Sequence, residues 1–172
     1  MSFRYAILLL ATYCSYSYAI EPLIASHTFK RLMGSEVRHL SHYLQQIEAV
    51  THRNISEHQA RRIIDYVDSA AVYRRTKDDI AELRKAFQRR KIMIAADWCY
   101  HTQKKMPELT SMDQVTENPW ELHHIIFLRM NGENNWWNIF PIPKIDHHVV
   151  IHGKDQPGEI LHSMLQERMP ES

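Results

Sequence analysis

The stretch of sequence from residue 121 to residue 154 reads ELHHIIFLRMNGENNWWNIFPIPKIDHHVVIHGK. It holds five of the twelve histidines in the 172-residue chain, as two adjacent pairs and one single residue. These histidines are at positions 123, 124, 147, 148 and 152. The composition elsewhere is ordinary, so this concentration of imidazoles indicates a site with its own chemistry.

The residues around these histidines form short apolar runs separated by turn residues, a pattern typical of strands joined by loops. The predicted elements are a strand over 122–130, a turn over 131–134, a second extended segment over 136–142, a short helix over 147–152 and a final helix over 157–168. Asp146 is expected to cap the short helix, Gly153 to end it, and Pro157 to open the last one. The first three main elements give the order ββα.

Histidine spacing in the second half of this stretch predicts a metal site. His148 and His152 are four residues apart, a spacing that places two side chains on one face of an α-helix. A third ligand from a neighbouring strand would leave one position open, as catalytic metal sites do. Histidine ligands favour zinc or nickel over magnesium, which prefers oxygen.

The first histidine pair predicts a different division of roles. Adjacent residues in a strand point to opposite faces, so His123 and His124 cannot both bind one ion from a regular strand. One can bind metal while the other accepts a proton from water, a task that suits the ordinary histidine pKa of about 6.5. The bland alternative is a structural metal site or a set of solvated histidines.

The segment upstream of this stretch has helical periodicity and almost no Gly or Pro. Apolar residues at three- and four-residue spacing predict three helices, over about 28–50, 55–74 and 77–95. Asn54 followed by Glu57, and Thr76 followed by Asp79, resemble capping boxes at two of the starts. The polar segment after Lys104 is expected to connect this helical region to the histidine-rich one.

The first nineteen residues are predicted to be a secretory signal peptide rather than part of the fold. Arg4 precedes an apolar run over 5–11, and a small-x-small sequence ends at Ala19. The run is far shorter than the roughly 20 residues that a transmembrane helix needs. This predicts a secreted or periplasmic protein with no membrane anchor in its mature form.

Charge and cysteine content exclude some simple classes. The chain has 21 Lys and Arg and 20 Asp and Glu, so loss of Arg4 would leave twenty of each. Global charge therefore gives no argument for nucleic acid binding, which would need a local patch. Seven positive residues in the range 84–105, set against Asp97, could form such a patch if they lie beside the histidines. Cys99 alone remains after cleavage, so no intramolecular disulfide is expected.

Taken in order, these residues resemble the HNH, or ββα-metal, endonuclease motif. The matching elements are Glu121-Leu122-His123-His124, then Asn138-Ile139, then His148 and His152. The nearest forms are the DNase-type colicins and pyocins and the LHH-type polymorphic toxin nucleases. The resemblance covers about a fifth of the chain, and the helical region upstream matches no family we could name.

The resemblance implies a role for each matching residue. His123, His148 and His152 would bind the metal, and His124 would be the general base for attack on a phosphodiester. Asn138 would hold the loop or orient His124. Glu121 would take a supporting role.

Two departures from the family pattern bear on these roles. The interval from Asn138 to His148 is one residue longer than in the colicins, and His147 would restore it. The spacing of five from His147 to His152 is disfavoured in an α-helix, so the prediction keeps His148. No arginine lies just ahead of Glu121 to hold the scissile phosphate. Arg129, Lys144 or a residue of the helical region would have to bind the substrate instead.

The sequence therefore predicts an α+β protein with a signal peptide, a helical region and a C-terminal ββα-metal module, at 1–19, 20–105 and 106–172. The expected activity is that of an exported endonuclease that hydrolyses DNA in preference to RNA and uses one divalent ion. Zinc is favoured, with nickel, magnesium and manganese as alternatives. A bacterial toxin with an immunity protein as partner is a compatible role. The alternative is a non-catalytic metal-binding or nucleic-acid-binding protein with a degenerate finger.

Overall fold

The computed structural model of the chain describes residues 20–69, 74–107 and 120–167. It is an α+β fold of mostly helices with one two-stranded antiparallel sheet, which confirms the predicted class. The main elements are α2 (Ile20–Ser26), α3 (Gly34–Thr51), α4 (Glu57–Asp68), α5 (Lys77–Thr102), β1 (Trp120–His124), β2 (Ile139–Pro143), α6 (Lys144–Asp146) and α7 (Pro157–Glu167). The predicted signal peptide lies outside the described residues.

Two predicted helix starts had different outcomes. The hydroxyl of Thr76 accepts a hydrogen bond from the backbone N–H of Asp79, so the predicted cap of α5 is confirmed. The predicted cap at Asn54 is wrong, because Ser56 caps α4 and accepts from the N–H of Gln59. The serine hydroxyl satisfies the same free backbone donors two residues later.

The two strands are shorter than the apolar pattern predicts. In the sheet His123 pairs with Phe140 and His124 with Ile139, and the ladder ends with a hydrogen bond from the N–H of Ile125 to the carbonyl of Asn138. The side chain of Asn138 explains this limit, because it bonds to both the N–H and the C=O of Ile126. These backbone groups are therefore satisfied without a strand partner, and the connection folds into short 3₁₀ turns at 128–130 and 136–138.

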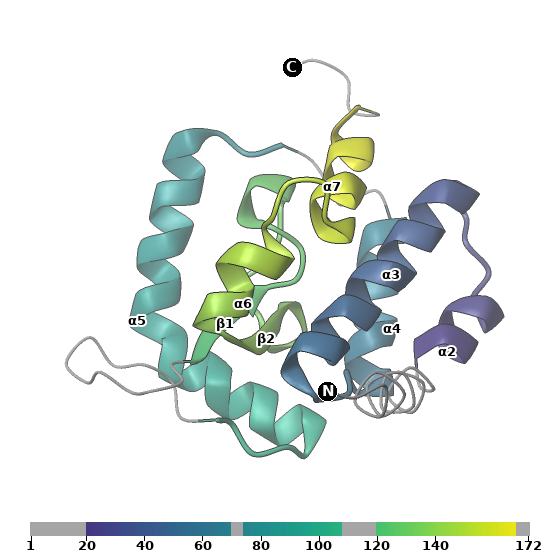
Figure 1. Ribbon diagram of the computed structural model, residues 1–172. Coiled ribbons are helices and arrows are strands. Elements are labelled where there is room, and N and C mark those ends of the chain that lie inside the picture. Colours follow the sequence, from purple (N-terminus) through teal and green to yellow (C-terminus); the bar gives the residue numbers. More distant parts are fainter. Residues whose placement is uncertain (1–19, 70–73, 108–119, 168–172) are drawn as a thin grey trace, which may run out of the picture.

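The small sheet lies between helices that come from the other half of the chain. Figure 1 shows β1 and β2 between α5 on one side and α3 and α4 on the other. Side chains from both halves meet in one core, where Trp98 of α5 contacts the ring of Phe140 at a centroid distance of 5.7 Å. The division into a helical region and a module stays a prediction, but the two segments share this core.

Polar side chains of the helical segment also fix the loop between the strands. The amide of Gln59 on α4 donates to the carbonyls of Trp137 and Ile139. The guanidinium of Arg75 donates to the carbonyl of Gly132, and the hydroxyl of Tyr66 donates to that of Asn131. The loop is thus held against a rigid helical support.

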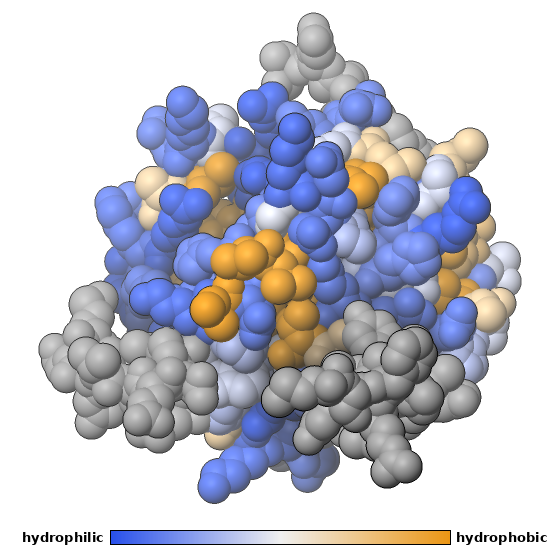
Figure 2. Space-filling model, viewed as in Figure 1, coloured by the Kyte–Doolittle hydropathy of each residue, from blue (hydrophilic) through white to orange (hydrophobic). Residues whose placement is uncertain are grey.

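Most of the apolar residues in the described structure are buried. The face in Figure 2 is largely hydrophilic, with an apolar area over α6 and the turn that follows it, where Ile145 and Val149 are exposed. Among the described residues, no helix combines the length and apolarity needed to cross a membrane.

Glu48 is an ionisable group buried in the helical core. Its side chain on α3 is 1% exposed, and one carboxylate oxygen accepts from the N–H of Ile55 at 2.7 Å. Burial raises the pKa of Glu48 to about 7, although the Ile55 hydrogen bond and the charge of Lys104 act in the opposite direction. The other carboxylate oxygen has no hydrogen-bond partner among the described residues.

We expect Glu48→Gln to stabilise the protein at pH 8 and to have little effect at pH 5. The folded state binds the extra proton between pH 4.5 and about 7, so the wild-type free energy of unfolding falls as pH rises through that window. Glutamine keeps an acceptor for Ile55 and cannot ionise, so its advantage at pH 8 should be on the order of 1 kcal/mol. Urea unfolding at both pH values measures this. The exposed Glu57→Gln is the control, and an equal effect of Glu48→Gln at both pH values would contradict the account.

Candidate metal centre

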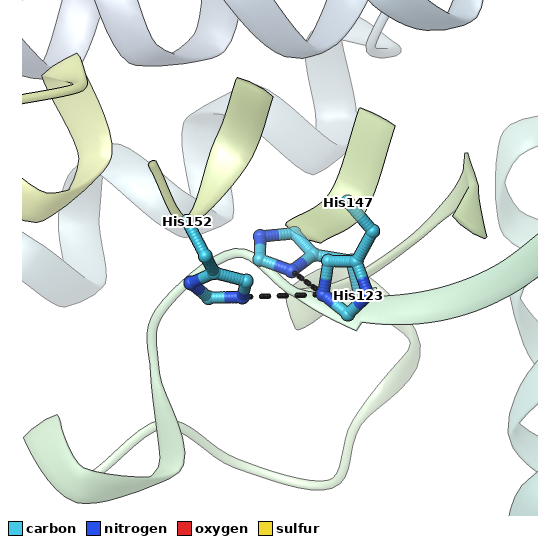
Figure 3. A group of neighbouring side chains, drawn as sticks. All are labelled: His123, His147 and His152. Carbon is cyan, nitrogen blue, oxygen red and sulfur yellow. Dashed lines mark hydrogen bonds between the residues drawn. The ribbon is translucent and has the colours of Figure 1, made fainter. Parts of the chain in front are cut away.

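Three histidines converge beside the sheet, as Figure 3 shows. His123 comes from β1, and His147 and His152 come from the two ends of the turn after α6. Nε2 of His147 lies 2.9 Å from Nδ1 of His123 and 3.2 Å from Nε2 of His152. Nitrogens of the three rings all lie within 4.8 Å of one another, a spacing that could hold a metal ion.

The turn that carries two of these residues is π-helical and runs over His147–Ile151. The N–H of His152 donates to the carbonyl of His147 five residues earlier, at 3.1 Å. In this winding residues i and i+5, not i and i+4, stand above one another. The structure therefore brings His147, and not the predicted ligand His148, against His123.

His148 lies outside the three-histidine group. Its side chain is 64% exposed, and its Nε2 is 3.8 Å from a carboxylate oxygen of Glu121. With Glu121 and His147 it forms a second, more exposed set of neighbouring donor atoms.

Each ring of the group has a hydrogen-bond partner on the nitrogen that faces away from the other two rings. Nε2 of His123 lies 2.7 Å from the hydroxyl of Tyr43. Nδ1 of His147 lies 2.8 Å from Glu121, and Nδ1 of His152 lies 3.2 Å from Glu159. Outer partners of this kind orient metal-binding histidines and make them more basic.

These outer partners assign the proton of each neutral ring. The carboxylates of Glu121 and Glu159 only accept, so the outward nitrogens of His147 and His152 carry their protons. Tyr43 donates its one hydroxyl proton to the carbonyl of Ile125, so its oxygen accepts from Nε2–H of His123. Each of the three inward nitrogens then carries a lone pair and no proton. A shared cation stabilises this arrangement.

Burial keeps the rings of His123 and His147 neutral. It lowers the pKa of His123 well below its usual range, with the neighbouring His147 and His152 acting in the same direction. Burial also lowers the pKa of His147, against the effect of Glu121. Neutral imidazole is the form that binds metal, so these two rings need not lose a proton near neutral pH.

The donor set fits a divalent ion of intermediate softness. Two nitrogens that bind one tetrahedral zinc ion at about 2.0–2.1 Å lie roughly 3.3 Å apart, close to the separations found here. Three imidazoles with no carboxylate among them suit zinc or nickel better than magnesium. Three protein ligands would leave the fourth position for water or substrate.

His124 lies beside this group and is held by a different partner. Its Nε2 lies 2.8 Å from Oδ1 of Asn134, whose amide nitrogen donates to the carbonyl of Leu83 on α5. The amide is thereby fixed with its oxygen toward His124, so Nε2 carries the proton and Nδ1 is left as the acceptor. Burial lowers the pKa of His124 to about 4, so the ring is neutral at pH 7.

Asn138 is the residue for which two roles were predicted. Its side chain is fully buried and bonds to Ile126 and to the carbonyl of Glu133, so it holds the loop. It makes no hydrogen bond to His124 in the described structure, where Asn134 makes that contact instead.

A pocket of about 460 Å³ opens in front of the histidines. His123, His124, His147 and His152 line it, as do residues of α5 and the side chains of Phe127 and Arg129. The guanidinium of Arg129, predicted to bind substrate, lies 2.6 Å from Glu159 and over the ring of Phe127. Lys144, the second predicted residue, lies 4.0 Å from Glu121 and does not line the pocket.

Sequence reasoning missed Tyr43, Asn134 and Glu159. Tyr43 comes from α3, eighty residues before His123, and its hydroxyl reaches the site because Gly158 on α7 leaves room for the ring. A Cβ at Gly158 would lie 2.5 Å from that ring. No local pattern signals such long-range contacts, whereas Asn134 lies within the histidine-rich stretch and could have been considered.

We expect Tyr43→Phe to weaken metal binding by about 10- to 100-fold, the range typical of lost outer-partner contacts. The ring stays in the core, but His123 loses the acceptor that fixes its tautomer. Competition with a chromogenic zinc chelator measures the affinity. Tyr66→Phe is the matched control, because its hydroxyl donates to the carbonyl of Asn131 in the loop. Equal affinities for both variants would show that the Tyr43 contact does not position His123.

Comparisons with known proteins give two distant relatives, and no family model matches the chain. One is "Probable deoxyribonuclease RhsB" of Dickeya dadantii, 31% identical over 84 residues, or 49% of this chain and 5% of that protein. The other is "Toxin YxiD" of Bacillus subtilis, 25% identical over 131 residues, or 69% of this chain and 23% of that protein. The chain thus spans less than a quarter of either relative. One relative is thus named as a probable deoxyribonuclease and the other as a toxin.

Proposed function

We propose that the protein is a metal-dependent deoxyribonuclease of the HNH type. The observation that carries the proposal is the set of three inward lone pairs on His123, His147 and His152, beside a neutral His124. The similarity to a probable deoxyribonuclease supports DNA as the substrate. The order of two strands and a helical turn is consistent with a ββα-metal finger.

The ligands in this proposal are His123, His147 and His152, with His147 in the place first given to His148. Glu121, Glu159 and Tyr43 keep the three rings oriented through their outward nitrogens. A divalent ion held there would supply Lewis-acid stabilisation of the charge that develops on a phosphodiester. Zinc fits the donors best.

His124 is the proposed general base. Its Nδ1 accepts a proton from a water molecule as the water oxygen attacks the phosphorus, and the bond from phosphorus to the 3′ oxygen breaks. Asn134 holds the ring through Nε2, so that Nδ1 remains free to accept. Asn138 contributes by keeping the loop that carries Asn134 in place.

A role as an exported toxin accords with the similarity to proteins named as a toxin and a deoxyribonuclease. In that role the segment 1–19 would direct export, and an immunity protein would protect the producing cell. The competing hypothesis is a finger that binds metal or nucleic acid without catalysis. This hypothesis predicts that His124→Ala does not change the rate of DNA cleavage, because the wild type would not cleave DNA either.

We expect His124→Ala to lower the rate of plasmid cleavage by about 10²- to 10⁴-fold, the usual contribution of a general base. Zinc affinity should stay within a few-fold of wild type, because His124 is not among the three converging rings. Cleavage is followed on supercoiled plasmid after loading with zinc, nickel, magnesium or manganese.

His42→Ala is the control for this experiment, since it removes an exposed histidine of α3 that is not one of the converging rings. Its cleavage rate should equal that of the wild type. If the wild type binds zinc but cleaves no DNA with any of the four ions, the non-catalytic hypothesis replaces the proposal.

A further inference from the structure

Helix α5 lines the pocket together with the histidines. Ile80, Arg84, Phe87 and Gln88 line the pocket from this helix. They follow helical spacing of three and four residues, so they identify the face of α5 that is turned toward the site. A charged side chain on this face can therefore contact a molecule that binds in the pocket.

Three cations of α5 share that face at intervals of seven residues. Arg84 lines the pocket itself, Lys77 lies two turns before it, and Lys91 lies two turns after it. Seven residues are close to two full turns, so the three side chains form a row along the helix. The row spans about 21 Å, since each residue adds about 1.5 Å. That length corresponds to roughly six base-pair steps of DNA.

No acid of α5 opposes this row. Asp78, Asp79, Glu82 and Asp97 are the acids of the helix, and none is three, four or seven residues from Arg84. Glu82 instead pairs with Lys85 on another face at 2.8 Å. Among the residues that the structure describes, none forms an ion pair with Arg84, whereas the nearby Arg129 is neutralised by Glu159.

Arg84 also lines the same pocket as the proposed base, His124. Phe87, one turn along α5 from Arg84, lies against the ring of His124 at a centroid distance of 4.6 Å. The centre of the row is therefore in the pocket where a phosphodiester would react.

We propose that Lys77, Arg84 and Lys91 bind successive phosphates of a DNA backbone and lay the strand across the pocket. This inference rests on the proposed nuclease function, because it assigns the surface that holds the substrate. Arg84 would contact the phosphate nearest the histidines, and the two lysines would contact phosphates on either side. It also explains how a chain with a net charge of only +1 could bind a polyanion.

The test compares two triple variants that remove the same charge from the same helix. One is Lys77→Ala, Arg84→Ala, Lys91→Ala; the other is Lys85→Ala, Arg89→Ala, Arg90→Ala, three exposed cations on other faces. Both are made in zinc-loaded full-length protein that carries His124→Ala, so that DNA is bound without being cut. Fluorescence anisotropy with a labelled 20-base-pair duplex gives the affinity at several salt concentrations.

The row variant should lose at least tenfold in affinity at low salt. Its slope of log affinity against log salt should fall by about 2–3, close to 0.9 for each lost phosphate contact. The control variant should keep its slope within about one unit of the parent. Equal slopes for the two triple variants would overturn the inference. DNA affinity would then depend on the number of positive charges on α5 and not on their position.

Folding controls and a cleavage assay of the wild type complete the test. Circular dichroism and thermal unfolding check that both triple variants fold, and Arg84→Ala against Arg89→Ala replaces them if either does not. The inference fails on its own if wild type cleaves DNA but the row can be removed without loss of binding. The proposed function fails on its own if wild type does not cleave DNA yet binding still depends on the row.

Discussion

The site depends on hydrogen bonds that hold three imidazole rings by their outer nitrogens. Tyr43, Glu121 and Glu159 each accept a hydrogen bond from the outward N–H of one ring, and this leaves three lone pairs directed at one another. Such an arrangement is unfavourable by itself and becomes favourable with a shared cation. The partners come from α3, β1 and α7, so the fold must bring three distant segments together before the group exists.

This dependence explains why the helical segment is more than an attachment to the sheet. Tyr43 reaches the histidines from α3, Leu83 of α5 fixes Asn134, and Gln59 of α4 holds the backbone of the loop. Each helix therefore fixes a different component of the site. The pocket itself lies between α5 and the histidine-bearing elements, so catalysis and substrate binding would draw on both halves of the chain.

Much of the fold could be predicted from sequence because its signals are local. Helical periodicity located α3, α4 and α5, and Thr76 marked the start of α5 within one residue. Histidine clustering located the site for the same reason. The strand ends could not be predicted, because the buried amide of Asn138 interrupts pairing where the apolar pattern continues.

The histidine at the second position of the group shows where local reasoning fails. A spacing of four favours His148 only if the turn is α-helical, and the π-helical winding makes a spacing of five the productive one. Glu121 on the neighbouring strand stabilises this choice through its contact with Nδ1 of His147. A contact between residues twenty-six positions apart thus decides which of two adjacent histidines faces inward.

The most direct test of the account is cobalt binding by His147→Ala and His148→Ala. Cobalt(II) reports tetrahedral ligation through its visible absorption, and it prefers the same imidazole donors as zinc. The account predicts that His147→Ala loses the absorption band and more than about a hundredfold in affinity. His148→Ala should keep both. Loss of the band in His148→Ala with retention in His147→Ala would contradict the central claim that His123, His147 and His152 form the metal centre.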